Sequence, residues 1–292
     1  MPDTPAQISV VLVTHNSLPA LSGCLKALTG AVAGTSCEVI VVDNASQDGS
    51  AEEVKRLFPR ARVISNARNL GFARACNQGT EAAGGGYLFF LNPDVELDTD
   101  AIAALLTVIK EHSDAGLVSG RLRYPDGAFQ ATCRRFPTIG NLIFSRGSAL
   151  AGFISKMRSP SNRYTLPDYA ETTDVPAVAA TMVMVRRALF TQVGGFDQRY
   201  FMFMEDTDLS LRLHQLGYRN LFVPSAGAVH DWGRGAKAGR IRRAYYHHVS
   251  LWKYFLKHFP NGFSVVVLPL LLFVNFISVI ILPERGARSG DR

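Results

Sequence analysis

Three carboxylates, Glu205, Asp206 and Asp208, stand directly after the apolar run Tyr200–Met204. At the start of a helix such charges gain from the helix dipole, and this placement accounts well for Asp208. It accounts less well for Glu205 and Asp206, because the preceding apolar run predicts a partly desolvated wall. Burial there would raise a carboxyl pKa toward the range of a general base. The pattern therefore makes Glu205 and Asp206 candidates for a catalytic base.

Another carboxylate follows the most apolar predicted strand, Tyr87–Leu91, where Asn92 and Asp94 flank a proline. A carboxylate at a strand end suits a hard divalent cation, Mg²⁺ or Mn²⁺, which takes oxygen ligands shared with a diphosphate. His230 ends a later strand and is a candidate further ligand of the same ion. The simpler alternatives are a proline-containing turn after the strand and a structural histidine.

Candidates for binding a nucleotide follow two earlier strands, at Thr14, Asn16, Asp43 and Asn44. The Asp43 carboxylate can accept a hydrogen bond from the N3–H of a uracil or thymine ring, and the other side chains can complete recognition of base and ribose. The alternative is that Asp43 and Asn44 only cap the following helix. A further candidate set is Asn69, Gly71 and Arg74, in which glycine permits close backbone approach and arginine pairs with phosphate.

The elements that must position these residues alternate between strands and helices. Strands are predicted at 8–13, 38–42, 62–65 and 87–91, and helices at 19–29, 51–58, 77–83 and 100–112. The second half predicts a turn at 123–127, a long loop over 145–172, strands within 175–185, helices at 187–193 and 205–216, and a strand at 218–223 leading to residue 230. Such alternation favours an α/β fold with a parallel sheet covered on both faces, whose ligands bind at the carboxyl ends of the strands.

The net charge of +7 over 292 residues invites the hypothesis of a nucleic-acid partner. Residues 1–233, however, hold 21 basic and 22 acidic side chains, whereas residues 234–292 hold 10 basic and 2 acidic ones. The charge therefore belongs to the tail, and we expect no nucleic-acid partner. Four cysteines without a CxxC pair argue against a disulfide scaffold or a zinc ribbon and fit a reducing cytosol.

The tail predicts two helices of different character. Residues 240–259 form a basic amphipathic pattern, with one polar face that carries Arg240, Arg243, His247, Lys253 and Lys257. Residues 263–282 contain no charge and are long enough to span a membrane, although a re-entrant hairpin or a buried helix are alternatives. Because the basic residues precede the apolar run, we expect the body on the cytoplasmic side and the basic helix on anionic lipid.

Four motifs occur in order along the chain and are specific in combination. They are VVDNASQDGS at 41–50, NLGFARACNQG at 69–79, LFFLNPDVEL at 88–97, and GGFDQRYFMFMEDTDLSLRL at 194–213 with His230. Together they resemble the inverting family-2 glycosyltransferases of the GT-A fold, and within them the bacterial rhamnosyltransferase-like enzymes. The resemblance covers residues 8–233 and implies a Rossmann-like mixed, mainly parallel sheet flanked by helices.

The resemblance also implies roles for individual residues. Asp43 would bind the nucleobase and Asp206 would be the catalytic base. Asp94 matches the last aspartate of a DxD metal motif, and His230 matches a histidine that completes metal binding. The first carboxylate of that motif is Asn92 here, so the metal has one charged ligand fewer. The loop beside the acceptor matches Gly195, Phe196 and Asp197.

The expected organisation is a nucleotide-sugar-binding half at 1–100, an acceptor-binding and catalytic half at 101–233, and a membrane-associated tail at 234–292. The expected function is transfer of a sugar, rhamnose from dTDP-rhamnose, to a hydroxyl of a lipid-linked or cell-surface glycan at the cytoplasmic face of the bacterial inner membrane. Alternatives are a galactofuranosyl or hexosyl transferase that uses a UDP-sugar, and a non-catalytic membrane adaptor. Nucleotidyltransferases and dinucleotide dehydrogenases need a glycine-rich loop after the first strand, which Thr14–Asn16 does not supply.

Overall fold

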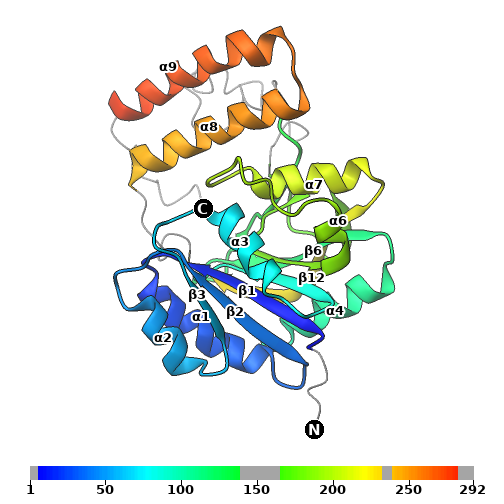
Figure 1. Cartoon of the computed structure of the whole chain (residues 1–292). Coiled ribbons are helices and arrows are strands. Elements are labelled where there is room, and N and C mark those ends of the chain that lie inside the picture. Colours follow the sequence, from blue (N-terminus) through cyan, green and yellow to red (C-terminus); the bar gives the residue numbers. More distant parts are fainter. Residues whose placement is uncertain (1–5, 139–164, 232–238, 282–292) are drawn as a thin grey trace.

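The computed structural model describes residues 6–138, 165–231 and 239–281. Most of the predicted loop over 145–172, and the last residue of the apolar run 263–282, lie outside these ranges. Figure 1 shows an α/β body built on one large sheet, with two C-terminal helices at one end of it.

The main sheet has ten strands, and eight of them follow the order β3-β2-β1-β4-β11-β6-β12-β5. Their bounds are β1 (Ile8–Thr14), β2 (Cys37–Asp43), β3 (Arg62–Ser65), β4 (Tyr87–Leu91), β5 (Val95–Leu97), β6 (Ala115–Arg123), β11 (Met182–Arg186) and β12 (Arg219–His230). The short strands β7 (Phe129–Gln130) and β9 (Thr173–Val175) pair with β6 and β12, and β8 (Cys133–Arg134) pairs with β10 (Ala177–Val178). The first four strands in this order are parallel, while β11 is antiparallel to both of its neighbours. The predicted mixed sheet with a parallel part is confirmed.

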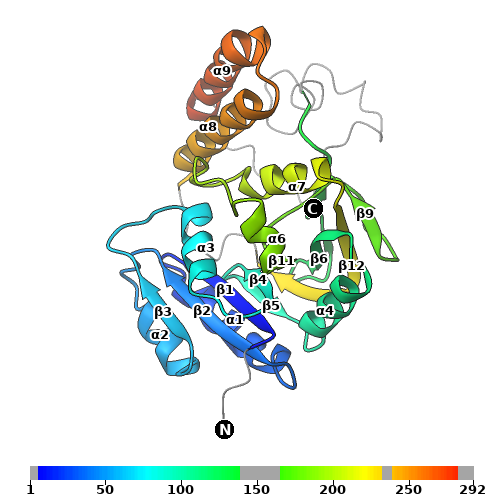
Figure 2. The same ribbon diagram turned by 45° about the vertical axis from the view of Figure 1, so that its right-hand side comes forward.

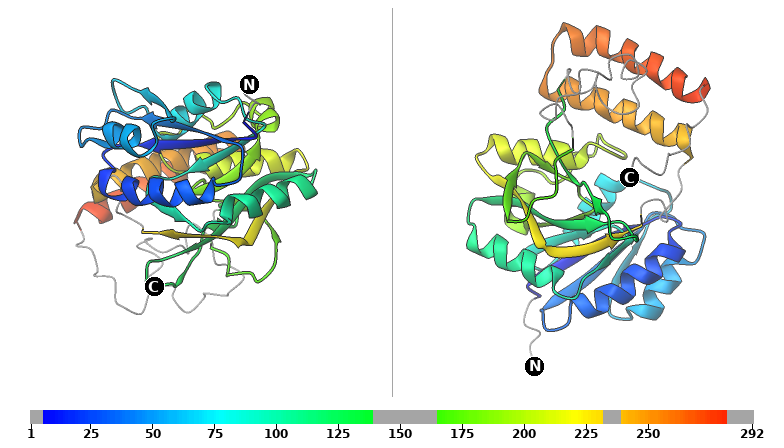
Figure 3. Two further views of the ribbon diagram at one scale, coloured as in Figure 1. Left: turned by 90° about the horizontal axis from the view of Figure 1, so that it is seen from below. Right: turned by 180° about the vertical axis from the view of Figure 1, so that it is seen from behind.

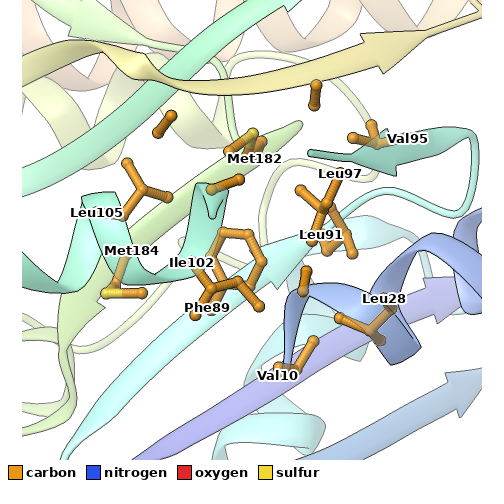
Figure 4. Packing of buried hydrophobic residues seen from close by; sticks show 14 of the residues in the cluster. Val10, Leu28, Phe89, Leu91, Val95, Leu97, Ile102, Leu105, Met182 and Met184 are labelled. Atoms are coloured by element: carbon orange, nitrogen blue, oxygen red, sulfur yellow. The ribbon is translucent and has the colours of Figure 1, made fainter. Parts of the chain in front are cut away.

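Helices cover both faces of the sheet. They are α1 (Leu18–Ala31), α2 (Ser50–Leu57), α3 (Phe72–Glu81), α4 (Ala101–Glu111), α6 (Arg187–Gln192) and α7 (Glu205–Gln215). Helices α1 and α4 pack on one face and α3, α6 and α7 on the other, as Figure 2 shows. Every residue of β1 is therefore buried, which explains why its sequence is almost continuously apolar. Figure 4 shows the core under α1 and α4, where Phe89 and Leu91 of β4 meet Met182 and Met184 of β11.

Two elements differ in extent from the sequence predictions. Helix α3 begins at Phe72, five residues before the predicted start at Asn77, because Gly71 with φ +86° turns the chain directly into it. Strand β12 continues from the predicted strand to His230, and its pairing with β6 shifts register between Val223 and Gly227. A bulge of this kind lets one strand remain paired while it bends.

The tail forms the amphipathic helix α8 (Arg240–His258), a π-helical turn at Phe263–Val267 and the apolar helix α9 (Leu268–Ile281). Both expected tail helices are thus present. Within the described ranges, Phe263–Ile281 is the one helix long and apolar enough to cross a membrane by length and composition. Figures 1 and 3 show α8 and α9 side by side at the same end of the molecule as α7, away from α1 and α2.

Candidate active site

Thr14 and Asp43 lie side by side at the carboxyl ends of β1 and β2, where their backbones are in register. Both residues are buried, and the Asp43 carboxylate accepts weak hydrogen bonds from the Ser46 N–H at 3.2 and 3.3 Å. The Thr14 hydroxyl is buried without a hydrogen-bond partner. A buried hydroxyl rarely stays unsatisfied, so this strand end fits a polar ligand group. The structure thus brings two of the predicted nucleotide-binding residues together.

Three of the predicted nucleotide-binding residues hold loops in place. The Asn44 amide donates to the Gly71 carbonyl at 3.2 Å, and the Asn69 side chain accepts from the Gly71 N–H at 2.9 Å. Asn16, at a positive φ of 50°, accepts from the Gln47 N–H at 2.7 Å. These side chains already hydrogen-bond to the protein backbone. They therefore contribute to a ligand site by fixing the shape of the loops around it.

Gly71 lies where the loop before α3 meets the segment that precedes α7. A Cβ atom at Gly71 would lie 2.5 Å from the Phe201 carbonyl oxygen, which itself accepts from the Phe72 N–H at 2.9 Å. We expect Gly71→Ala to displace this loop and to weaken donor binding by about tenfold, the equivalent of about 1.4 kcal/mol. Calorimetric titration with the nucleotide-sugar measures the effect.

Gly34 provides the matched control for this substitution. Its φ is +78°, close to that of Gly71, but a Cβ atom there would meet nothing within 4 Å. Gly34→Ala therefore also places alanine at a positive φ, at a cost of about 1–2 kcal/mol, but without the steric clash. Equal donor affinities of the two variants would show that the contact with Phe201 has no role in binding.

Helix α3 is joined to the loop that follows α6. The Asn77 side chain accepts from the Phe196 N–H at 3.0 Å and donates to its carbonyl at 2.8 Å, and Arg74 donates to Gln198 at 3.1 Å. A Cβ atom at Gly195 would lie 2.7 Å from the Asn77 side-chain oxygen, so glycine is required there. Arg74 itself lies at an exposed position.

The predicted acceptor loop divides into a buried and a polar part. Phe196 is only 1% exposed and packs against Phe90 and Phe190, so its ring belongs to the core. The Asp197 carboxylate is ion-paired with Lys257 at 2.7 Å and with Arg199 at 2.9 Å. A hollow of about 260 Å³ lies beside Val193–Gln198, with Lys257 in its wall. Phe196 therefore supports the loop from beneath, and the polar residues face the hollow.

Asp94 and His230 meet because β5 pairs with β12. Val95, the residue after Asp94, lies opposite His230 in this antiparallel pair, and His230 Nε2 is 3.3 Å from the Asp94 carboxylate. His230 Nδ1 is 2.5 Å from the Gln130 side-chain oxygen, and in the neutral tautomer with the proton on Nδ1 the lone pair of Nε2 faces Asp94. Two electron-rich groups that face each other in a buried site fit a cation between them.

The two side chains do not form a complete metal site alone. In the part of the chain that the structure describes, no group of three His, Cys, Asp or Glu side chains is arranged to hold a metal ion. Mg²⁺ and Mn²⁺ are commonly held by one or two protein ligands together with substrate phosphates. The pair of Asp94 and His230 therefore fits an ion that arrives with, or is shared by, a diphosphate.

Glu205 and Asp206 occupy the buried first turn of α7. The chain enters this turn through Phe203 and Met204, which both have positive φ, at 68° and 71°. Such strain in residues other than glycine is typical of functional sites. Asp206 Oδ2 accepts a hydrogen bond from Arg134 Nη2 at 2.8 Å, and Oδ1 accepts from the Thr207 N–H at 2.6 Å.

The two carboxyls differ in their electrostatic environment. Glu205 Oε2 is buried without a partner, and burial, followed by the negative charge of Asp206, raises the pKa of Glu205 to about 8. The pKa rise expected from the apolar run thus falls on Glu205. At neutral pH Glu205 is protonated, whereas Asp206 is ion-paired with Arg134. Of the two carboxyls, Asp206 is therefore the one suited to accept a proton.

Asp208 has another role in the same helix. Its fully buried carboxylate accepts from Arg212 at 2.8 Å, from Lys257 at 2.6 Å and from His258 at 2.7 Å. Burial would raise its pKa, but the His258 hydrogen bond and the two cations outweigh this effect and hold the pKa of Asp208 at about 2. The sequence interpretation as a dipole effect is therefore incomplete, because Asp208 ties α7 to the tail.

The predicted polar face of the amphipathic helix is wrong for two lysines. Lys257 binds Asp197 and Asp208, and Lys253 donates to the Arg199 carbonyl at 2.8 Å. Both lysines therefore contact the body, so neither belongs to a surface that faces lipid. Arg134, Gln130 and His258 also contact site residues, and none of the three was predicted from the sequence. The run of two arginines at 134–135 was a weak signal for the first, and no local pattern indicated the other two.

Solved structures with the same architecture are glycosyltransferases. A mannosyltransferase from Pyrobaculum calidifontis, in complex with GDP-Man and Mn²⁺, superposes with a TM-score of 0.58 at 19% identity, over 96% of this chain and 75% of that one. Staphylococcus aureus TarS residues 1–349 give a TM-score of 0.55 at 14% identity, over 94% of this chain and 81% of that one. The fold is therefore GT-A-like, as the motifs predicted.

Sequence relatives point in the same direction. The N-acetylglucosaminyl-diphospho-decaprenol L-rhamnosyltransferase of Mycobacterium tuberculosis is 32% identical over 236 residues, which cover 76% of this chain and 75% of that protein. Rhamnosyltransferase WbbL of Escherichia coli is 36% identical over 148 residues, 49% of this chain and 52% of that protein. The family model described as glycosyl transferase family 2 matches residues 9–194. The chain is a glycosyltransferase and belongs to glycosyl transferase family 2.

Proposed function

We propose that this enzyme transfers L-rhamnose from dTDP-rhamnose to a hydroxyl group of a lipid-linked glycan intermediate, with inversion at the anomeric carbon. The observation that carries the proposal is the buried carboxylate of Asp206 at the start of α7, which Arg134 holds at 2.8 Å beside the buried side chain of Glu205. The rhamnosyltransferase names of the M. tuberculosis and E. coli relatives support the sugar. The decaprenol-linked acceptor in the first of these names supports the class of acceptor.

In this mechanism the acceptor hydroxyl approaches Asp206, which takes its proton. The acceptor oxygen bonds to the anomeric carbon as the bond from that carbon to the donor diphosphate breaks, and dTDP leaves on the opposite side. Arg134, which donates to Asp206 Oδ2 at 2.8 Å, holds the carboxylate in one orientation until the hydroxyl arrives. Neutral Glu205 adds no second negative charge beside the base.

Asp94 and His230 would hold Mg²⁺ or Mn²⁺ together with oxygens of the donor diphosphate. The bound ion would offset the negative charge that develops on the leaving diphosphate. The Mn²⁺ in the P. calidifontis structure supports this class of ion. Asn92 leaves the site with one carboxylate fewer than a DxD motif, so we expect weaker binding of the metal alone than of the metal with donor.

The donor half at 1–100 would supply Thr14, Asp43 and Asp94, and the catalytic half at 101–233 would supply Asp206 and His230. Asp43 would accept from the N3–H of the thymine ring. Arg74, at its exposed position on α3, would approach the diphosphate. The body would face the cytoplasm, since the basic residues of the tail precede the apolar helix.

Substitution of either member of the metal pair tests the metal site. Asp94→Ala and His230→Ala should each weaken donor binding in the presence of Mn²⁺ by at least about tenfold, or about 1.4 kcal/mol. Titration of each variant with dTDP-rhamnose, with and without Mn²⁺, measures the donor affinity. The control is Asp98→Asn, which removes a nearby carboxylate that is occupied with Arg123 at 2.6 and 2.8 Å. Unchanged donor affinity in both metal-pair variants would contradict this assignment.

A donor panel tests the function itself. Transfer to a lipid-linked N-acetylglucosaminyl diphosphate is measured with dTDP-rhamnose, UDP-galactofuranose, UDP-glucose and GDP-mannose, and thermal stabilisation reports binding of each donor. We expect turnover and stabilisation with dTDP-rhamnose. Preference for a UDP-sugar would favour the galactofuranosyl or hexosyl alternative, and binding without turnover of any donor would contradict the proposed reaction.

A further inference from the structure

The apolar helix of the tail exposes its side chains over most of its circumference. Only 11% of the most apolar part of Phe263–Ile281 is buried. Its most exposed apolar residues are Leu270, Phe273, Val274 and Ile281, each between 63% and 71% exposed. A surface of this size and character marks a site of interaction with a membrane or another apolar partner.

This helix is fixed along α8. Trp252 donates to the Ser264 carbonyl at 3.1 Å at one end of the pair, and Asn275 bonds to His248 at 2.9 Å farther along. Tyr245 contacts Phe276 still nearer the start of α8, with ring centroids 6.3 Å apart. The order of these contacts makes α8 and α9 an antiparallel hairpin, which Figure 3 shows from two directions.

Helix α8 is in turn fixed along the catalytic body. Tyr246 stacks on Phe201 at 4.5 Å between ring centroids, and Ser250 donates to the Met202 carbonyl at 2.8 Å. Lys257 completes the row at Asp208. These contacts extend over three turns of α8, so α8 lies along the body and α9 lies along α8.

This geometry is incompatible with α9 crossing a bilayer. If α9 stood along the membrane normal, α8 and the body segment that it contacts would have to enter the hydrocarbon with it. That segment carries the charges of Asp197, Arg199 and Asp208, and α8 adds five basic residues and no acidic one. Charged side chains in the hydrocarbon are costly and rare.

We propose that α9, held along α8, is a monotopic anchor that lies in the plane of one leaflet of an anionic phospholipid bilayer, with α8 between the anchor and the body. Phe273 and Val274 would lie among the acyl chains. Arg240 and Arg242 line a largely apolar groove of about 700 Å³ between the two helices, and Arg242 is exposed at its rim, where it can pair with a lipid phosphate. The charge of this rim favours an anionic bilayer as the occupant over a neutral apolar partner.

The anchor also fixes where a lipid-linked acceptor meets the enzyme, a consequence that rests on the proposed function. The face of α8 opposite the anchor contacts Phe201 and Phe203, the residues directly before Glu205. The bilayer surface and the catalytic turn therefore lie on two sides of one helix, whose diameter is about 10–12 Å. A sugar next to the head groups would reach Asp206 without leaving its lipid.

The topology of the full-length chain in bacterial membranes gives the first test. With a protease-cleavable epitope after the last residue, the epitope and the body should both be protected in intact spheroplasts and both be digested in inverted vesicles. Digestion of the epitope in intact spheroplasts, with the body protected, would mean that α9 spans the membrane and would overturn the proposal. The test needs no substitution, so it does not depend on the folding of a variant.

Vesicle sedimentation gives the second test, with phosphatidylglycerol–phosphatidylcholine vesicles as the probe. Phe273→Asp combined with Val274→Asp should lower the vesicle partition constant of the full chain by at least about tenfold, or about 1.4 kcal/mol. The control is Leu216→Asp, at a residue 60% exposed on the body, which should bind like the unmodified chain. Equal binding of all three proteins would overturn the proposal, as would an unmodified chain that dimerises through this face and binds no vesicles.

Activity on a water-soluble acceptor distinguishes this inference from the proposed function. The Phe273→Asp/Val274→Asp variant should keep transfer to a short soluble acceptor and lose transfer to the lipid-linked one. If the unmodified chain binds vesicles as expected but transfers no rhamnose, the anchor stands and the proposed reaction fails. If transfer to the lipid-linked acceptor persists in a variant that has lost vesicle binding, the positioning role of the anchor is wrong.

Discussion

Asp206→Asn is expected to lower the rate of transfer by about 10²–10⁴-fold, the range for loss of a general base. Asparagine keeps the size of the side chain and its hydrogen bond from Thr207, but it cannot take the acceptor proton. Donor affinity should stay near that of the unmodified enzyme, since donor binding does not require this proton transfer. Single-turnover kinetics at saturating donor, together with donor titration, separate the two quantities.

Glu205→Gln is the matched control for this substitution. Because burial and Asp206 raise the pKa of Glu205 to about 8, glutamine imitates the protonated form that exists at pH 7. We expect turnover at pH 7 within a few-fold of the unmodified enzyme. If Glu205→Gln were as inactive as Asp206→Asn, Glu205 would share the role of the base and the assignment to Asp206 alone would be wrong.

The same control has a pH signature in stability. A carboxyl group whose pKa is raised on folding binds its proton more tightly in the folded chain, so its contribution to stability is present below its unfolded pKa, near 4.5, and is lost as the pH rises toward about 8. Glu205→Gln removes this dependence. The variant should therefore gain thermal stability relative to the unmodified chain between pH 5 and pH 8, measured by calorimetry across that range.

Lys257→Met combined with His258→Leu is expected to lower the free energy of unfolding by about 3–5 kcal/mol, the cost of leaving a buried charge without its partners. Asp208 is fully buried, and the substitutions remove two of its three charged or ionisable partners. Chemical denaturation measures the loss. The rate of sugar transfer should fall as well, because Asp208 lies in the same helical turn as Asp206, two residues after it.

Two variants control the interpretation of this result. Lys253→Met removes a lysine of the same helix that donates to a backbone carbonyl at an exposed site, so we expect a change below about 1 kcal/mol. Asp208→Asn in the Lys257→Met/His258→Leu background removes the charge that has lost two of its ion-pair partners and should restore part of the lost stability. Absence of any recovery would mean that lost packing, and not the buried charge, causes the destabilisation.

The pH dependence of this contact follows from the low pKa of Asp208. A carboxyl whose pKa is lowered on folding from 3.8 to about 2 contributes stability that is complete above its unfolded pKa and is lost as the pH falls through the folded value. We therefore expect α8 to remain docked down to about pH 4 and to detach between about pH 4 and pH 2.

The parts of the fold that depend on local sequence pattern could be predicted closely. Strands β1 and β4 were predicted almost to the residue, because both sides of a parallel sheet are buried and the sequence is continuously apolar there. The start of α3 was missed because Gly71 serves a contact with Phe201, which is 130 residues away and invisible to any local pattern.

The sequence indicated which residues belong to the candidate site, but it did not indicate most of their hydrogen-bond and ion-pair partners. The strand-end residues Asp43 and Asp94 were found because parallel strands present their carboxyl ends at one edge. Tertiary packing determines three of these contacts. They are the hydrogen bond from Asn44 to Gly71, the one from Arg134 to Asp206 and the one from Lys257 in the tail to Asp208. The motifs of the family indicated which residues matter, while the structure shows which atoms hold them.

The contact between Asp208 and the tail also constrains the order in which this enzyme can be made. Asp208 leaves the ribosome 49 and 50 residues before Lys257 and His258. Synthesis proceeds at about 5–20 residues per second, so for several seconds the nascent chain contains Asp208 without Lys257 and His258. During that time burial of the Asp208 carboxylate is energetically unfavourable. A chain that ends before Lys257 would lack two of the ion-pair partners of Asp208, so we expect its catalytic helix to be held less firmly than in the full chain.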